Sequence, residues 1–358
     1  MNIIKKLLLI LFITLLIFLT LDFFLGKKIE NLIKITDEEK IYRIKNEFYH
    51  HSFLKNYSTE KARWGNKFYK FCSDHNGFKY DCKKNNETNF NYAFIGDSFT
   101  EGIGLEYEDT FVGMFENFTK QTVVNLGVSS YSPYLYKNKV IYLLENKIIN
   151  FNHLIVAVDL SDLNDDRSFN EIYFSKKNLK KTKNSNYHKY NFLSNFIVKI
   201  KIILAKNFII TDYLARQIWW LGVRNFFNNY SEHYIAYDNI NSSWSYRKKI
   251  EDEKDINFMV ENMLQLSKYL KKNDIKFSLI IYPHPASILY DDKSSLYKKT
   301  WENFCFLHCD YFIDSFSNFF DIVKNKDEII KEYYINGDVH LNRNGNFFLF
   351  KKLINNLK

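Results

Sequence analysis

Short apolar runs alternate with amphipathic stretches along most of the chain after residue 90. The apolar runs predict strands at 92–96, 122–127, 153–160, 275–282 and 311–315. The amphipathic stretches predict helices at 109–120, 133–147, 256–273, 292–306 and 343–357. Strands that alternate with helices are typical of a parallel sheet covered on both faces. The pattern predicts an α/β fold over residues 89–358, interrupted by an insertion at 166–255.

One long apolar run lies near the N-terminus. Residues 7–25 contain a single ionisable side chain, Asp22, and nineteen helical residues come close to spanning a bilayer core of about 30 Å. The run ends at Lys27 and Lys28 without a small-residue cleavage site, which favours an uncleaved transmembrane anchor over a removed signal peptide. Lysines flank both ends, but the short basic segment 1–6 favours a cytoplasmic tail and a domain outside the cytoplasm, in the periplasm.

Two further segments differ from the α/β pattern. Residues 26–88 are mixed and charged, which indicates a stem with a small N-terminal subdomain. Residues 192–227, within the insertion, combine aromatic and aliphatic side chains with recurring Lys and Arg. Three alternatives fit them: a helical cap over a substrate cleft, a face that rests on the membrane, or a helical pair packed on the core. The recurring charges disfavour a second membrane span.

Composition and charge limit the partners. The chain has 358 residues, 46% of them hydrophobic, which fits one large domain with insertions or one domain plus an accessory region. The formal net charge of +9 would attract anionic partners such as phospholipid head groups or uronic-acid polymers. The lysines are dispersed and no nucleic-acid module is visible, so we expect no nucleic-acid partner.

The four cysteines form two spacings. Cys72 and Cys82 bracket a polar loop that a disulfide could close in an oxidising compartment. Cys305 and Cys309 lie four apart, a spacing that suits a helix face better than a disulfide, so we expect buried thiols. The spacings do not match those of a zinc site.

Candidate chemistry is concentrated at two distant places. Gly96-Asp97-Ser98 follows the first predicted strand, where open α/β sheets carry their reactive groups. Near the other end of the chain, Asp338 and His340 precede the last predicted helix. Serine, histidine and aspartate are the parts of a nucleophilic triad.

Four segments, in this order, resemble the SGNH/GDSL hydrolase superfamily. They are FIGDSFTEGIGLEYEDTF (94–111), VVNLGVSSYSP (123–133), LIVAVDLSDLNDD (154–166) and GDVHLNRNG (337–345). The resemblance implies a three-layer α/β/α, flavodoxin-like fold whose five parallel strands are ordered 2-1-3-4-5. It also implies Ser98 as the nucleophile, His340 as the base, Asp338 as its orienting acid, and the backbone N–H groups of Ser98 and Gly127 as oxyanion donors.

Two departures from the superfamily pattern matter. Ser161, followed by Asp162, replaces the asparagine that usually completes the oxyanion hole, and Asn164 is a candidate substitute. The spacing Asp-x-His replaces Asp-x-x-His, as in the SGNH-like domains of polysaccharide O-acetylation proteins, which shifts the expected substrate toward cell-envelope glycans.

Two other polar groups follow predicted strands. An acidic cluster at the end of the third strand lacks the spacing of a calcium loop, so we predict capping and hydrogen bonding there rather than a metal; its members are Asp159, Asp162, Asp165 and Asp166. His284, after the fourth strand, either lines the pocket or belongs to a simple turn. We expect no cofactor.

The sequence therefore favours a membrane-anchored SGNH esterase or O-acyltransferase that acts on acyl esters, acetyl above all, of a cell-envelope glycan. A non-catalytic glycan-binding or assembly protein on the same scaffold is the alternative, and a lipase-like esterase is the third. The inner membrane, reached through the N-terminal helix, and the acyl-ester substrate are the expected partners.

Overall fold

The protein divides into two compact units. A computed structural model describes residues 3–33, 42–64, 67–83, 86–169, 207–211, 214, 243–247 and 253–357. One unit comprises residues 1–37 and 176–230, and the other comprises residues 38–175 and 231–358. The second unit contains the predicted sheet and all the candidate site residues.

Five parallel strands form the central sheet of the second unit. They are β5 (Asn89–Gly96), β6 (Val123–Asn125), β7 (Asn150–Val158), β8 (Lys276–Ile281) and β9 (Tyr311–Asp314). Their order is β6-β5-β7-β8-β9, and every neighbouring pair is parallel. The predicted order 2-1-3-4-5 is confirmed.

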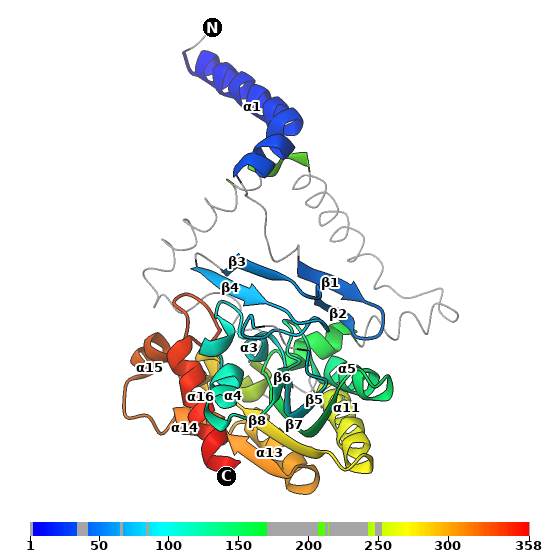
Figure 1. Ribbon diagram of the computed structural model, residues 1–358. Coiled ribbons are helices and arrows are strands. Elements are labelled where there is room, and N and C mark those ends of the chain that lie inside the picture. Colours follow the sequence, from blue (N-terminus) through cyan, green and yellow to red (C-terminus); the bar gives the residue numbers. More distant parts are fainter. Residues whose placement is uncertain are drawn as a thin grey trace, which may run out of the picture. The chain divides into compact units, whose positions relative to one another are not determined.

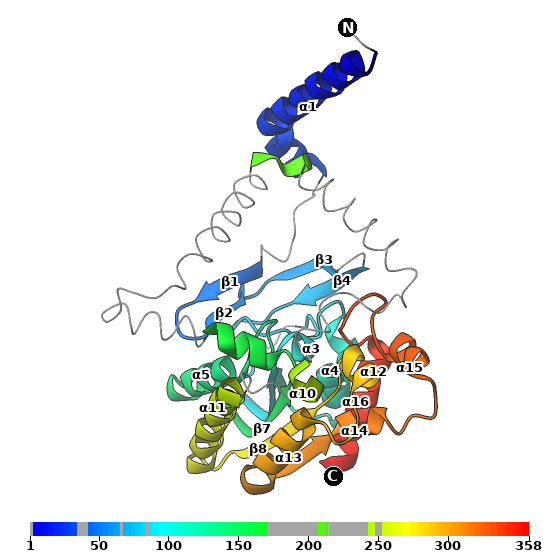
Figure 2. The same cartoon turned by 180° about the vertical axis from the view of Figure 1, so that it is seen from behind.

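Helices cover both faces of this sheet, so the unit has three layers (Figures 1 and 2). Alternate residues of a strand point to opposite faces. Ile95 and Val156 pack with α5 (Pro133–Glu145), α11 (Glu253–Lys272) and α13 (Leu296–His308). Phe94 and Ile155 pack with α4 (Phe111–Thr119), α15 (Lys326–Tyr333) and α16 (Arg343–Asn356). Apolar side chains on both faces explain why these strands appear in the sequence as continuous apolar runs.

The helix predicted at 292–306 corresponds to α13, which begins at Leu296. The short helix α12 (Pro285–Tyr290) precedes it, separated by a polar turn, and was not predicted. Pro285 occupies the first turn of α12, where proline favours helix initiation. The short helix α14 (Ser315–Phe319) and α15 were not predicted, and α10 (Ser243–Arg247) is a described part of the predicted insertion.

Two antiparallel hairpins form the N-terminal part of the second unit. They pair β1 (Arg43–Asn46) with β2 (His50–Phe53) and β3 (Ser58–Trp64) with β4 (Lys67–Cys72). Stacked rings of Tyr42 and Phe71, 4.2 Å between centroids, join the two hairpins in the core. In both views the hairpins lie over the end of the sheet that carries α3 (Ser98–Glu101) (Figures 1 and 2).

Both cysteine pairs are disulfides. The Cys72–Cys82 bond closes the loop after β4, as the sequence allowed. Cys305 and Cys309 are also bonded, with 4.6 Å between their Cα atoms, so the expectation of buried thiols is wrong. Cys309 caps the end of α13 in an extended conformation, and the pair is therefore not held at the separation of two residues within a helix.

The first unit contains α1 (Ile3–Ile33), whose stretch Lys5–Gly26 is long and apolar enough to cross a membrane. Signal sequences share this length and composition, and the helix continues past the predicted end at residue 25. Asp22, buried near the end of the stretch, accepts hydrogen bonds from the backbone N–H of Ile210 (3.0 Å) and from Thr211 N–H (2.7 Å) and Oγ1–H (2.6 Å). The described part of 192–227 thus contacts α1, and the rest of that segment lies outside the described residues.

Candidate active site

Ser98 lies at the carboxyl end of β5, at the start of α3. Asp97 caps this helix, and its Oδ1 accepts the Phe99 N–H at 2.9 Å. The helix ends after one turn at Gly102, whose φ of 70° is the left-handed conformation that glycine adopts at little cost. The strand and the short helix together fix the Ser98 side chain at the sheet edge where this fold class carries its sites.

A tight loop before α16 carries Asp338 and His340. Gly337 turns the chain with a φ of 73°, and the His340 carbonyl accepts the Ile335 N–H at 2.8 Å. The loop closes with a bridge between Tyr334 and Leu341. Asp338 Oδ1 also accepts the backbone N–H of His340 at 3.0 Å, so the carboxylate is held beside the imidazole that follows it.

The structure brings Ser98, His340 and Asp338 into one hydrogen-bonded series. Ser98 Oγ lies 2.8 Å from His340 Nε2, and His340 Nδ1 lies 2.5 Å from Asp338 Oδ1. Ser98 and His340 are both buried. These distances are those required between a nucleophile, its base and an orienting acid.

The electrostatics keep Asp338 ionised. Burial alone would raise the pKa of its carboxyl group, but the adjacent His340, two hydrogen bonds from His340 and one from Trp64 hold that pKa below its ordinary value. An ionised Asp338 fixes the proton on His340 Nδ1 and leaves Nε2 to accept the Ser98 proton.

Trp64 is a site neighbour that the sequence patterns did not identify. Its indole Nε1–H donates to Asp338 Oδ2 at 2.5 Å, and its ring meets the His340 ring edge to face, 5.2 Å between centroids. Trp64 ends β3, 274 positions before Asp338, and nothing near it in the sequence signals this contact.

The predicted oxyanion role of the Gly127 N–H stays a prediction, because this N–H has an acceptor within the chain. That N–H donates to Asn125 Oδ1 at 2.9 Å, in a turn formed where β6 ends. Gly127 also allows close packing: a Cβ there would lie 2.7 Å from the Glu101 backbone nitrogen and from the Thr100 side chain. The Ser98 N–H lies in the first turn of α3, where N–H groups lack an acceptor within the helix.

The other predicted oxyanion residues lie after β7. Asp162 accepts hydrogen bonds from the Tyr136 hydroxyl (2.9 Å) and the Asp159 N–H (3.1 Å), and its place in the oxyanion or binding site stays a prediction. Ser161 N–H donates to Asp159 Oδ1 at 2.7 Å, and Asn164 N–H donates to the Ser161 carbonyl at 2.9 Å. The oxyanion roles of Ser161 and Asn164 stay predictions.

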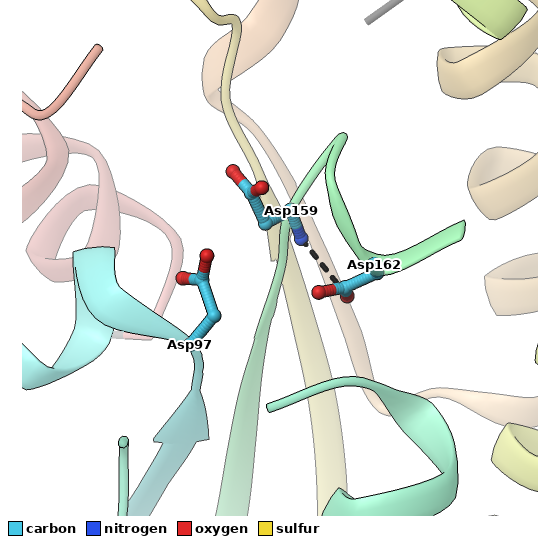
Figure 3. Close-up of side chains that lie close together, drawn as sticks. All are labelled: Asp97, Asp159 and Asp162. Carbon is cyan, nitrogen blue, oxygen red and sulfur yellow. Dashed lines mark hydrogen bonds between the residues drawn. The ribbon is translucent and has the colours of Figure 1, made fainter. Parts of the chain in front are cut away.

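A buried acidic cluster adjoins Ser98. Carboxylate oxygens of Asp97, at the end of β5, and of Asp159 and Asp162, after β7, lie within 4.8 Å of one another (Figure 3). His284 Nε2 lies 2.8 Å from Asp159 Oδ2, and the His284 ring stacks on Phe99, 5.3 Å between centroids. His284 thus contacts the acidic cluster and Phe99, and it is also the residue that precedes α12.

The pKa values of the three carboxyl groups in this cluster move in different directions. Burial, followed by the negative charge of Asp159, raises the pKa of Asp97 well above its ordinary value, and the same causes raise that of Asp162. Burial would also raise the pKa of Asp159, but His284 and hydrogen bonds from Ser161 hold it low. Asp159 is therefore the ionised member of this cluster, and it is paired with His284.

Comparison with known proteins gives only distant similarity. No family model and no curated protein matches the chain. A solved psychrotrophic esterase from Pseudoalteromonas sp. is 11% identical, covers 75% of this chain and 96% of its own, and has a TM-score of 0.36. A GDSL-like lipase from Bacteroides thetaiotaomicron VPI-5482 is 11% identical, covers 75% and 86%, and also has a TM-score of 0.36. Similarity at this level carries no argument about function. The function proposed below therefore depends on the sheet order and the site geometry.

Proposed function

We propose that this protein is a serine-dependent ester hydrolase with an SGNH-type site. The observation that carries the proposal is the position of His340, whose two ring nitrogens lie within hydrogen-bond distance of Ser98 and of Asp338. The location of Ser98 at the carboxyl end of β5, in a sheet of order β6-β5-β7-β8-β9, supports the same assignment.

The reaction follows from this geometry in two steps. Ser98 Oγ attacks the ester carbonyl carbon while its proton passes to His340 Nε2. The bond from that carbon to the alcohol oxygen then breaks, and His340 returns the proton to the leaving alcohol. A water molecule next gives a proton to His340 and attacks the acyl-serine, which releases the carboxylic acid and restores Ser98. A sugar hydroxyl in place of water would make the same intermediate a transferase step.

Charge develops on the carbonyl oxygen in both steps. The Ser98 N–H, at the N-terminal end of α3, is the donor best placed by the helix to stabilise it. Ser161 and Asn164 are the proposed further donors, since a hydroxyl or an amide can each supply one hydrogen bond.

The proposed substrates are acyl esters of a cell-envelope glycan, acetyl esters above all. The spacing of Asp338 and His340, which resembles that of polysaccharide O-acetylation proteins, supports this choice, as does the formal net charge of +9 if the glycan is acidic. The apolar helix α1 and two disulfides support a domain anchored in the inner membrane and facing an oxidising compartment, the periplasm.

Labelling with a fluorophosphonate probe tests the proposal directly. The wild-type chain should be labelled on Ser98 and should hydrolyse p-nitrophenyl acetate, whereas Ser98→Ala should do neither. Ser294→Ala, which alters an exposed serine before α13, is the matched control and should behave as wild type. A folded wild-type chain that resists the probe would exclude the enzyme and favour a glycan-binding protein.

A further inference from the structure

The second oxygen of the Asp338 carboxylate is held by a residue of the N-terminal hairpins. Oδ1 lies within hydrogen-bond distance of His340 Nδ1, and Oδ2 accepts the Trp64 Nε1–H at 2.5 Å. Both contacts together fix the plane of the carboxylate, because rotation that weakens one bond also weakens the other. The hydrogen bond from Trp64 therefore helps to fix the orientation of Asp338, and Asp338 in turn orients His340.

The Trp64 ring also restricts the imidazole itself. Its edge-to-face contact with His340 lies on one side, and Phe99, 4.9 Å from the His340 ring between centroids, lies on another. An imidazole confined by two aromatic rings and two hydrogen bonds has little freedom to turn away from Ser98.

Trp64 is itself held in place by the structure around it. A Cβ on Gly104, whose φ is 75°, would lie 3.4 Å from the Trp64 Cβ and Cδ1 atoms, so the loop after α3 packs closely on this side chain. The neighbouring hairpin is tied to α3 by Arg43, whose guanidinium binds both oxygens of the buried Glu101 at 2.7 and 3.0 Å. Glu101 is the last residue of the helix that begins at Ser98.

We propose that Trp64 is a positioning residue for the Ser98–His340–Asp338 site, and that the N-terminal hairpins are thereby part of the catalytic machinery. This inference rests on the proposed ester hydrolase function. It assigns to residues 42–83 a role beyond that of a stem between membrane and enzyme.

The test replaces Trp64 by Phe in the full-length chain, which keeps an aromatic ring and removes the N–H. We expect kcat for p-nitrophenyl acetate to fall about 10- to 100-fold, the loss typical of one hydrogen bond to a charged group. KM should stay within about twofold of the wild-type value, because the proposed role of Trp64 acts through Asp338 and His340 and not through substrate binding. The acid limb of the kcat/KM profile reports protonation of the base, and it should move to higher pH, because an Asp338 carboxylate without the indole N–H stabilises the protonated base more strongly.

A second measurement does not depend on turnover. The proton shared by His340 Nδ1 and Asp338 Oδ1 should give a downfield ¹H resonance that is absent from His340→Ala and shifted in Trp64→Phe. Phe68→Leu is the control on the same hairpin, since Phe68 is exposed and contacts Arg63. If Trp64→Phe fails to fold, β-(3-benzothienyl)alanine at position 64 keeps the shape and removes only the N–H.

The outcomes separate the two proposals. An unchanged resonance, pH profile and kcat in a folded Trp64 variant of an active enzyme would overturn the positioning role alone. A wild-type chain with the resonance but without probe labelling or hydrolysis would overturn the ester hydrolase. A fall in kcat with neither a shifted resonance nor a moved acid limb would reduce Trp64 to a structural residue.

Discussion

Serine is a weak nucleophile until a neighbouring base removes its proton, and at the residue scale the proposed chemistry depends on that transfer. Ser98→Ala and His340→Ala should each lower kcat by a factor on the order of 10⁶, because the members of a triad act as a unit. Asp338→Asn should lose less, on the order of 10⁴, since the amide keeps the shape but favours the wrong imidazole tautomer. Hydrolysis of p-nitrophenyl acetate by the purified variants measures these losses.

A double variant supplies the control for this prediction. Ser98→Ala with His340→Ala should be no slower than either single variant, because each alone removes the covalent route. Losses that simply multiply would mean that the two residues act independently, and the shared site would be refuted.

The residue scale also shows what the sequence could reveal about the site. Ser98, Asp338 and His340 were identifiable because each lies in a local motif at a strand end or before a helix. The hydrogen bond from the Gly127 N–H to the Asn125 side chain could not be predicted, because no backbone motif reports the direction of that side chain. Trp64 could not be found, since its contact depends on how a separate hairpin packs over the sheet edge.

At the element scale, α5 carries a buried lysine. Lys139 is fully buried, donates from Nζ to the Leu126 carbonyl at 2.9 Å, and faces the rings of Tyr49, Phe78 and Tyr131. Burial lowers its pKa to about 7. The unfolded chain binds this proton up to a pH of about 10.4. Between these values only the unfolded state holds the proton, so stability should rise with pH, by about 1.4 kcal/mol per pH unit.

Lys139→Met tests this dependence by removing the titrating group. The melting temperature of the wild type, relative to that of the variant, should increase as the pH rises from 7 to 9. Lys268→Met, at an exposed position of α11, serves as the control and should give a difference that does not change with pH. A Lys139 difference that is flat over this interval would mean that the amine stays protonated in the fold.

The elements themselves were predictable to different degrees. The five strands could be located because they are apolar on both faces, and the helices that follow them carry clear apolar stripes. The hairpins β1–β4 were not resolved within the mixed segment 26–88, because their short strands are partly exposed and polar. The Cys305–Cys309 bond was missed because a spacing of four suits two residues on one helix face, although the predicted helix ended at 306, before Cys309.

At the scale of the whole molecule, the chain joins an apolar helix to an α/β unit with a candidate active site. Residues of α1 such as Leu11 and Ile17 expose more than half of their surface, as expected of a helix that is surrounded by lipid. Asp22, in contrast, is buried, and its carboxylate accepts hydrogen bonds from Ile210 and Thr211. A helix with these properties is suited to remain in the membrane after insertion.

We therefore expect the full-length chain to stay in the membrane pellet after washing with alkaline carbonate. Leu11→Arg combined with Ile17→Arg should release it, because each arginine near the middle of a span costs about 2.5–3.5 kcal/mol of insertion free energy. Leu11→Ala with Ile17→Ala is the matched control and should remain bound.

Protease added to spheroplasts should digest the α/β unit if it faces the periplasm. Digestion only after lysis would reverse the proposed orientation, and release of the wild-type chain by carbonate would show that α1 is not a membrane anchor.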